Sequence, residues 1–183
     1  SGNDLVVANQ GNAVIGVYNT SGSLLNSITT TGTPPDATLS GNDIFIPSPV
    51  SGISEYNTSG TLVNSFSTPP SIYDIGISGN DLFIPSYQNN VIGEYTTSGG
   101  VVDASLITGL SSPQGLAILG NDLFVINQGT SSVGEYTLSG GTVSASLITG
   151  LDGPTYIAVA PEPSTLALAG FGTAALWLWR RRK

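Results

Sequence analysis

A short phrase occurs four times along this chain of 183 residues, and it constrains the fold more than any other feature. The phrase is a Gly-Asn-Asp turn followed by an apolar triplet, and its four aspartates are Asp4, Asp43, Asp81 and Asp122. They recur about every 40 residues, and self-similarity at such a period is the signature of a repeat architecture. We therefore expect one structural unit to be repeated along residues 1–159.

The strand pattern inside one repeat follows from the fourth copy. Apolar or alternating runs at 113–118, 123–126, 133–137 and 142–149 are separated by turn residues such as Gly120-Asn121 and Ser139-Gly-Gly. β-Branched and aromatic residues dominate these runs, as in strands. Four short antiparallel strands in about 40–45 residues correspond to one blade of a β-propeller. The sequence thus predicts an all-β fold, a β-propeller of about four four-stranded blades.

The phase of the repeats bears on how the blades would close. Residue 1 follows the position of an inner strand, whereas residues 154–159 repeat the inner-strand pattern without a blade of their own. Pairing residues 154–159 with the strands of residues 4–30 would close a ring of four blades and remove the sheet edges. The rival is an arc of a larger propeller. Because the first residue is Ser and not Met, we also expect an upstream segment, where any secretory signal would lie.

The repeats resemble the NHL and YVTN class of propeller repeats. The resemblance is carried best by residues 113–118 (Pro-Gln-Gly-Leu-Ala-Ile) and 120–125 (Gly-Asn-Asp-Leu-Phe-Val), and it extends over residues 1–159. It implies a propeller, in a class whose members usually have six or more blades. The second and third repeats depart from the pattern, because Asp36 and Asp74 stand where the fourth repeat has Gly115.

The charge distribution excludes several kinds of function. All four basic residues are the last four, so residues 1–179 carry twelve acidic side chains and no basic one. Such a surface cannot neutralise phosphates, and we expect no nucleic-acid partner. The chain has no His and no Cys, which removes Ser-His-Asp and Cys-His catalysis and ordinary zinc sites. Carboxylate and calcium chemistry stay open, and we expect no cofactor.

Most of the recurring polar residues have a structural explanation. The four turn aspartates suit tight turns, where Asp bonds nearby backbone N–H groups. Glu55, Glu94 and Glu135 precede a strand tyrosine, and we expect them to face solvent. Two Asn-Thr-Ser sequences, beginning at Asn19 and Asn57, match a glycosylation acceptor but fall at hairpin turns.

One polar set is a candidate ligand face. Asp36 and Asp74 share a repeat position near the start of the inner strand, which in a propeller lies close to the mouth of the central channel. Loops expected on the same face add Asn9, Gln10, Tyr87, Gln88, Asn89, Asn90, Asn127 and Gln128. Two carboxylates there could hold Ca²⁺ or a polar ligand, and amides and Tyr87 suit sugar hydroxyls. Asn and Gln also simply favour loops, so both interpretations stand.

The last 24 residues, 160–183, follow a different pattern and form a second predicted domain. Pro161, Glu162 and Pro163 break regular structure, residues 166–179 are uncharged and apolar, and Arg180, Arg181, Arg182 and Lys183 end the chain. Residues 164–179 would make one short transmembrane helix of about 24 Å. The basic cluster predicts that this end stays in the cytoplasm and the propeller lies outside.

This tail resembles a PEP-CTERM sorting signal in its Pro161-Glu162-Pro163 motif, its short apolar helix and its terminal arginines. The resemblance implies export across the inner membrane of a Gram-negative bacterium and recognition by an exosortase, a membrane-embedded transpeptidase. It further implies transient anchoring in the inner membrane, loss of the tail, and a final place at the cell surface or in the extracellular matrix, in association with exopolysaccharide and biofilm.

Two functions fit these observations. The first is a non-enzymatic binding or structural scaffold, with polysaccharide or other surface proteins as partners. The second is a calcium-dependent propeller lactonase or lyase acting on extracellular substrates. Because Asp36 and Asp74 are the only carboxylates that the repeats bring together, and no His or Lys accompanies them, the sequence favours the scaffold.

Overall fold

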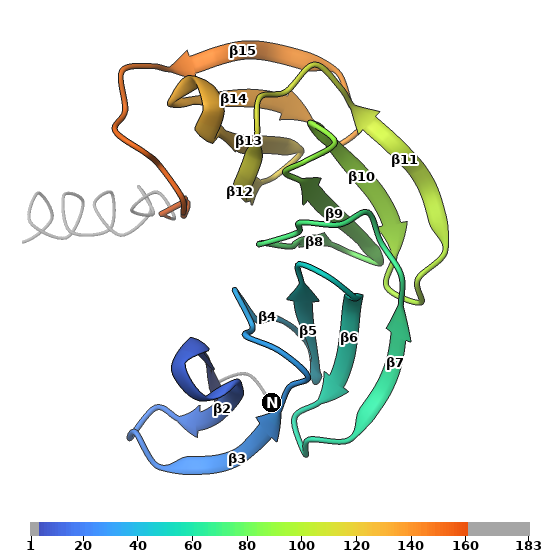
Figure 1. The fold of residues 1–183 in the computed structure, drawn as a ribbon, viewed down its shortest axis with the longest axis vertical. Helices are drawn as coiled ribbons and strands as arrows, with labels where there is room; N and C mark the ends of the chain where they lie inside the picture. Colours follow the sequence, from blue (N-terminus) through green and yellow to red (C-terminus); the bar gives the residue numbers. More distant parts are fainter. Residues whose placement is uncertain (1–3, 161–183) are drawn as a thin grey trace, which may run out of the picture.

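The computed structural model describes residues 4–160, which form four β-propeller blades arranged along an arc (Figure 1). The predicted tail helix, the Pro-Glu-Pro motif and the terminal basic cluster lie outside the described residues. Within residues 4–160, no helix is long and apolar enough to cross a membrane.

Every pair of neighbouring strands in the four sheets is antiparallel. The first blade consists of β1 (Asp4–Asn9), β2 (Val14–Asn19) and β3 (Leu24–Thr29), and the 3₁₀ turn η1 (Gln10–Asn12) joins β1 to β2. The second consists of β4 (Thr38–Ser40), β5 (Asp43–Ser48), β6 (Gly52–Asn57) and β7 (Leu62–Phe66). The third consists of β8 (Gly76–Ser78), β9 (Asp81–Ser86), β10 (Val91–Thr96) and β11 (Val101–Ile107). The fourth consists of β12 (Pro113–Leu119), β13 (Asp122–Asn127), β14 (Ser132–Thr137) and β15 (Thr142–Ile148), with η2 (Gln128–Thr130) between β13 and β14.

The repeated Gly-Asn-Asp phrase forms the hairpin between the first two strands of blades two to four. Ser40 pairs with Asp43, Ser78 with Asp81 and Leu119 with Asp122, which leaves a two-residue Gly-Asn loop in each case. The loop glycines have φ of 61 to 63°. A positive φ at the first loop residue is typical of a type II′ turn, where Gly carries no steric penalty.

Three hydrophobic clusters lie at the three junctions between successive blades. Because side chains alternate along a strand, the second strand of each central blade contributes to two junctions. Leu82 and Ile84 of β9 pack toward the second blade, whereas Phe83 between them packs toward the fourth. Burial of each such side chain contributes about 1.5–3 kcal/mol, so blade-to-blade packing stabilises the arc.

The predicted closure of a four-blade ring is wrong for this structure. The first sheet has three strands, β1 pairs only with β2 among the described strands, and residues 154–159 form no strand. A ring of four blades would require a quarter-turn between neighbours. The blades instead pack face to face along an open arc, with the first and fourth blades at its ends (Figure 1).

Two smaller expectations are also corrected. The inner strands β4 and β8 have three residues each, shorter than predicted, because residues 34–37 and 72–75 run as non-strand backbone into the channel. Glu55 does not face solvent: it is buried, and burial together with the charge of Asp43 raises its pKa. Glu94 and Glu135 are half-buried.

Candidate ligand-binding site

The candidate site is a polar cavity of about 400 Å³ at the mouth of the channel. Each of the four inner segments contributes one or two consecutive residues to the lining, and Gln10 from η1 completes it. The first position supplies Pro35, Tyr73, Gln114 and Thr155, and the second supplies Asp36, Asp74 and Tyr156. In the fourth blade the second position is Gly115, which is not part of the lining. The repeat thus brings eight side chains from distant parts of the chain to one place.

Asp74 is the most constrained side chain of this site. It is buried, its Oδ1 accepts a hydrogen bond from the Ile75 N–H at 2.8 Å, and its Oδ2 accepts one from the Leu116 N–H at 2.8 Å. The second of these bonds joins the third blade to the fourth. Asp74 therefore fixes the spacing of two blades at the point where the cavity begins.

The pKa of Asp74 is raised to about 7. Burial is the largest cause, and the negative charge of Asp36 and a side-chain hydrogen bond with Asp36 raise it further, while the N–H groups of Leu116 and Ile75 lower it. Two carboxyl groups in contact favour a state in which one holds a proton. The pair therefore offers both a hydroxyl donor and carboxylate acceptors near neutral pH.

Gln114 adds an acceptor that sequence reasoning missed. Its Oε1 is buried and accepts no hydrogen bond from the described residues. A buried polar atom without a partner is costly and calls for a partner such as a bound ligand or water. Gln114 occupies the same repeat position as Tyr73 and Thr155, so reading the position before Asp36 and Asp74 in each repeat would have found it.

Tyrosines border the same cavity. The rings of Tyr73 and Tyr87 meet edge to face, with centroids 5.8 Å apart and an interplanar angle of 85°. Tyr156 is 71% exposed, and partial burial followed by the charges of Asp36 and Asp74 raises its pKa. The phenol of Tyr156 thus stays protonated and able to donate a hydrogen bond.

Of the predicted ligand face, Asp36, Asp74 and Gln10 line the cavity, and Tyr87 reaches it only through Tyr73. Gln88 is exposed and Gln128 is half-buried in η2, both outside the lining. Asn127 is buried, where its Oδ1 accepts the Ser111 N–H at 3.1 Å and its side chain hydrogen-bonds Tyr136. These contacts explain Asn127 by packing.

The residues present do not by themselves assemble a metal centre. Among residues 4–160, no group of three or more His, Cys, Asp or Glu side chains is placed to hold a metal ion. Asp36 and Asp74 supply two carboxylates, whereas Ca²⁺ takes six to eight oxygen ligands.

A second cavity, of about 450 Å³, continues the first along the channel. Asp36, Asp74 and Tyr156 border both, and the rest of the second lining is mainly apolar, including Leu39, Ile77 and Ile118. The carboxyl pair therefore borders both cavities and could contact a ligand in either of them.

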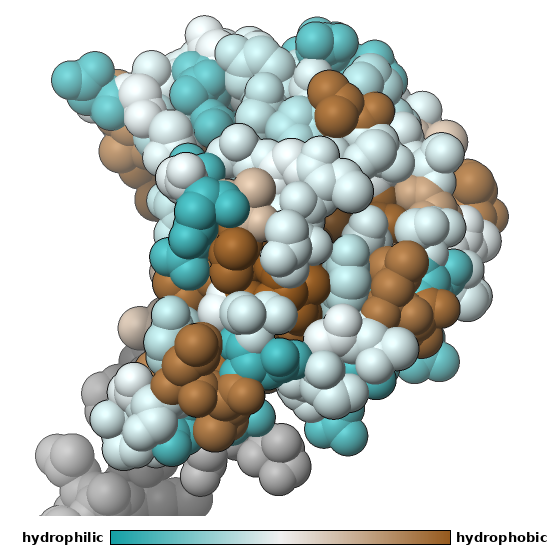
Figure 2. Space-filling model, turned by 60° about the horizontal axis from the view of Figure 1, so that its bottom comes forward, coloured by the Kyte–Doolittle hydropathy of each residue, from teal (hydrophilic) through white to brown (hydrophobic). Residues whose placement is uncertain are grey.

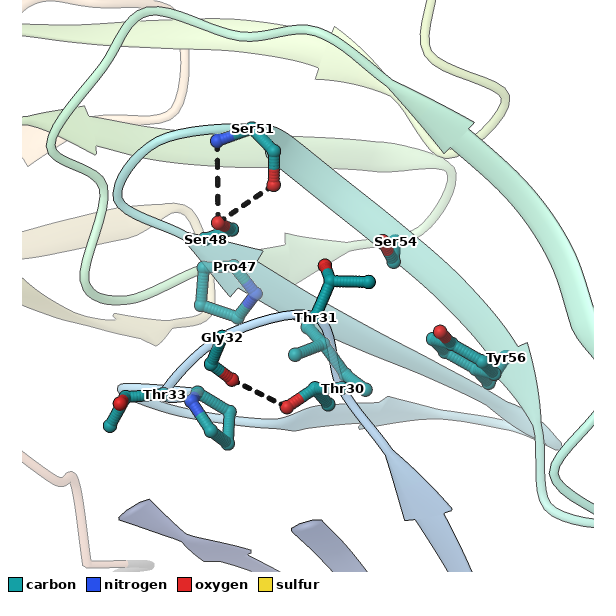
Figure 3. Close-up of a pocket in the computed structure, with 11 residues that line it drawn as sticks. Thr30, Thr31, Gly32, Thr33, Pro47, Ser48, Ser51, Ser54 and Tyr56 are labelled. Carbon is teal, nitrogen blue, oxygen red and sulfur yellow. Dashed lines mark hydrogen bonds between the residues drawn. The ribbon is translucent and has the colours of Figure 1, made fainter. Parts of the chain in front are cut away.

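A third, much smaller cavity lies between the first two blades (Figure 3). Hydroxyl side chains surround it, and its volume of about 20 Å³ is enough for about one water molecule. Ser51 donates to the Ser48 Oγ from its N–H at 3.3 Å and from its hydroxyl at 2.8 Å, and Thr30 donates to the Gly32 carbonyl at 2.6 Å (Figure 3). The hydroxyls thus bond one another, and this cavity is too small for an organic ligand.

Comparison with known proteins identifies the tail and the fold. Residues 159–183 match the PEP-CTERM protein-sorting motif. This motif implies an exported protein that is anchored transiently in a membrane before processing by an exosortase. No curated protein matches the chain in sequence.

Solved structures similar to this one include propellers of the NHL and virginiamycin B lyase type. The virginiamycin B lyase of Staphylococcus aureus is 18% identical, with a TM-score of 0.69, over 86% of this chain and 57% of the lyase. A streptogramin B lyase is 21% identical, with a TM-score of 0.70, over 86% and 56%. The hydrazine synthase of Kuenenia stuttgartiensis is 17% identical, with a TM-score of 0.71, over 81% and 47%. The chain spans about half the length of these structures, and at such identities the similarity establishes the fold alone.

Proposed function

We propose that this protein is an exported scaffold of the cell surface or extracellular matrix of a Gram-negative bacterium, and that its propeller binds a neutral polysaccharide without catalysis. The observation that carries the binding role is the polar cavity at the channel mouth, with the Asp36–Asp74 pair and the unpartnered Gln114 oxygen. The PEP-CTERM motif supports export.

The chemistry of the cavity favours sugar hydroxyls. Each hydroxyl both donates and accepts, and the cavity offers acceptors on Asp36 and Gln114 and donors on Tyr156 and protonated Asp74. Tyrosine rings supply flat apolar surface next to these groups. Because residues 1–179 carry twelve acidic side chains and no basic one, repulsion disfavours an anionic polymer.

The second candidate is a calcium-dependent lactonase or lyase. Its supporting observation is the pKa of Asp74, about 7, which is in the range of a general acid or base. Against it, each oxygen of Asp74 accepts a backbone N–H, so the carboxylate is held by two blades. The scaffold is therefore the better supported function.

Binding can be tested with a glycan array and titration calorimetry on the full chain in detergent micelles. We expect binding of a neutral glycan that falls at least tenfold in Gln114→Ala and in the Asp36→Ala/Asp74→Ala double variant. Gln88→Ala is the matched control, because Gln88 is exposed and outside the cavity. Calcium-dependent turnover of a lactone or polysaccharide, abolished in the double variant, would establish the enzyme instead.

Sorting can be tested separately in a host that has an exosortase. Glu162→Ala, or deletion of Arg180, Arg181, Arg182 and Lys183, should leave the chain unprocessed or mislocalised, as followed by immunoblotting of membrane and secreted fractions. Ser164→Ala is the control, since it lies beside the Pro-Glu-Pro motif without belonging to it. Normal processing of both altered tails would contradict the sorting role.

A further inference from the structure

The cavity at the channel mouth concentrates negative charge for which this part of the chain has no counter-ion. Asp36 and Asp74 line the cavity, and a side-chain hydrogen bond joins their carboxyl groups. Residues 4–160 contain no Lys, Arg or His, so no basic side chain of the described chain can pair with them. Because charges withdrawn from water in proteins are normally paired, the carboxyl pair calls for a cation from outside this part of the chain.

The two carboxyl groups are held in place by hydrogen bonds of their own. The oxygens of Asp74 accept the N–H groups of Ile75 and Leu116, both at 2.8 Å. Oδ2 of Asp36 accepts a hydrogen bond from the Thr38 hydroxyl at 3.2 Å. A carboxylate has about four acceptor positions, so each group can accept a further bond from a ligand. The pair is therefore preorganised, and a ligand need not order it on binding.

The acceptors of this lining suit an ammonium group better than a metal ion. A primary ammonium has three N–H donors and is satisfied by three acceptors, whereas Ca²⁺ takes six to eight oxygen ligands. Asp36 and Asp74 supply two acceptors. Gln10 donates its Nε2 to the Pro35 carbonyl at 3.4 Å, so its Oε1 is an acceptor that a ligand can use, and the Thr155 hydroxyl is another in the same lining.

The neighbouring side chains suit an alkyl stem beside the charge. Tyr156 lines the cavity, where burial and then the charges of the carboxyl pair raise its pKa, and the face of such a ring attracts a cation. Leu39, Ile77 and Ile118 line the second cavity, which the carboxyl pair also borders. The surface is indented on the concave side of the arc, and hydrophobic groups lie beside polar ones there (Figure 2). An ammonium head with a methylene stem matches both kinds of neighbour.

We infer that the Asp36–Asp74 pair is a binding site for the primary ammonium group of a small alkyl amine, such as a diamine or polyamine. The ammonium donates to both carboxylates and neutralises them, and its methylenes lie along the apolar side chains of the second cavity. The acidic surface of residues 1–179 attracts such a cation. This ligand goes beyond the proposed polysaccharide role, and its binding does not depend on that role.

The amine and a neutral sugar require opposite protonation states of the pair. Burial and then the charge of Asp36 raise the pKa of Asp74 to about 7, so the pair without a ligand holds a proton at pH 5. Tyr73 and Tyr156 are the other titratable side chains of the lining, and phenols do not ionise in this range. An ammonium stabilises the ionised pair, so its binding releases the proton and strengthens as the pH rises. A sugar that accepts a hydrogen bond from protonated Asp74 binds more weakly as the pH rises.

Titration calorimetry of the full chain in non-ionic detergent micelles tests the site with cadaverine, whose amines stay charged below about pH 10. We expect its affinity to rise about tenfold or more from pH 5 to pH 8, because the competing proton leaves with a pKa of about 7. Titrations at pH 6 in buffers of different ionisation enthalpy should show proton release. Pentanediol, in which hydroxyls replace both amines, should not bind. Absence of cadaverine binding, or an affinity that falls as the pH rises, would overturn the inference.

Asp36→Asn and Asp152→Asn remove the same charge at two places. Asp36→Asn preserves the shape of the side chain and should lower the affinity for cadaverine at least tenfold at pH 8. Asp152 is exposed and outside both cavities, so Asp152→Asn should leave the affinity unchanged. Equal losses in the two variants would show unspecific attraction to an acidic surface and would overturn the site.

Tyr156→Leu tests the same site without altering a carboxyl group. Because Tyr156 is 71% exposed, the variant should fold, and loss of the ring should weaken cadaverine binding by about two- to fivefold. Unchanged affinity in both Tyr156→Leu and Asp36→Asn would place the amine elsewhere on the molecule.

Two further ligands separate the inference from its alternatives. Acetyl-lysine amide, acetylated only at its α-amino group, presents the same ammonium on a peptide unit. Tighter binding of this compound than of cadaverine would assign the site to lysine side chains of a protein partner and overturn the small-amine ligand. A neutral glycan that binds where cadaverine does not would leave the polysaccharide role standing while this inference fails. Cadaverine binding without glycan binding would support this inference and contradict the polysaccharide role.

Discussion

The first and third blades carry the same sequence pattern and bury it to different extents. Leu82 of the third blade is 0% exposed and Leu5, at the equivalent position of the first blade, is 51% exposed. Among residues 4–160, the third blade has four strands and packs against a blade on each face, whereas the first has three strands and packs against the second blade alone. The repeat sequence therefore specifies the shape of a blade. The contribution of each side chain to stability depends on whether an adjacent blade covers it.

Truncation of the equivalent leucines should show the largest difference. Leu82→Ala should lower the free energy of unfolding by about 2–5 kcal/mol, because it leaves a cavity in a closed cluster. Leu5→Ala should lower it by no more than about 0.5 kcal/mol, as expected for an exposed side chain.

Urea denaturation at several protein concentrations measures both. Equal losses of unfolding free energy in Leu82→Ala and Leu5→Ala would contradict the difference in burial between the two side chains.

This contrast also explains what the sequence could predict. The number of blades, the Gly-Asn hairpins and the positions of the second strands follow from local pattern, and the structure confirms them. Whether Leu5 is covered, and whether residues 154–159 pair with β1, depends on how far each blade turns relative to its neighbour. No residue of a single repeat encodes that angle, so the predicted closure was wrong.

The candidate site was likewise predicted only in part from the sequence. Asp36 and Asp74 were found because they break the repeat at a position that faces the channel, and they line one cavity. Gln114 was missed because it looks like an ordinary loop amide, and its significance depends on the burial of its Oε1. Asn127 was included for its residue type, although Ser111 and Tyr136 occupy its polar atoms.

The inner segments provide the second comparison, because Asp74 joins the third blade to the fourth, whereas the fourth blade has Gly115 at the equivalent position. Its pKa is raised to about 7, so the folded state binds the proton more tightly than the unfolded chain does. Its contribution to stability is therefore fully present below about pH 4 and is lost as the pH rises through 7.

We expect the free energy of unfolding to fall by about 4 kcal/mol between pH 4 and pH 8 on account of Asp74. Asp74→Asn should flatten the profile in this window, whereas Asp152→Asn, at an exposed carboxylate, should leave it unchanged. Urea denaturation across the window measures all three proteins. An increase in stability from pH 4 to pH 8 that disappears in Asp74→Asn would reverse the sign of this argument.

The last prediction concerns Gly115, which stands in the fourth blade where blades two and three have Asp36 and Asp74. A Cβ at Gly115 would lie 2.7 Å from the carbonyl oxygen of Thr155 and 3.2 Å from the Ile126 Cδ1. The absence of a side chain here lets residues 154–159 lie against β12, at the cavity wall that Tyr156 forms. Because the obstructing atom is backbone, Gly115→Ala should displace the segment and cost about 1–2 kcal/mol.

Gly11→Ala is the matched control, since no atom lies within 4 Å of a Cβ at Gly11. Hydrogen exchange should detect faster exchange of residues 154–159 in Gly115→Ala and no change in Gly11→Ala. Unchanged exchange of residues 154–159 in Gly115→Ala would show that contacts other than those with β12 hold this segment in place.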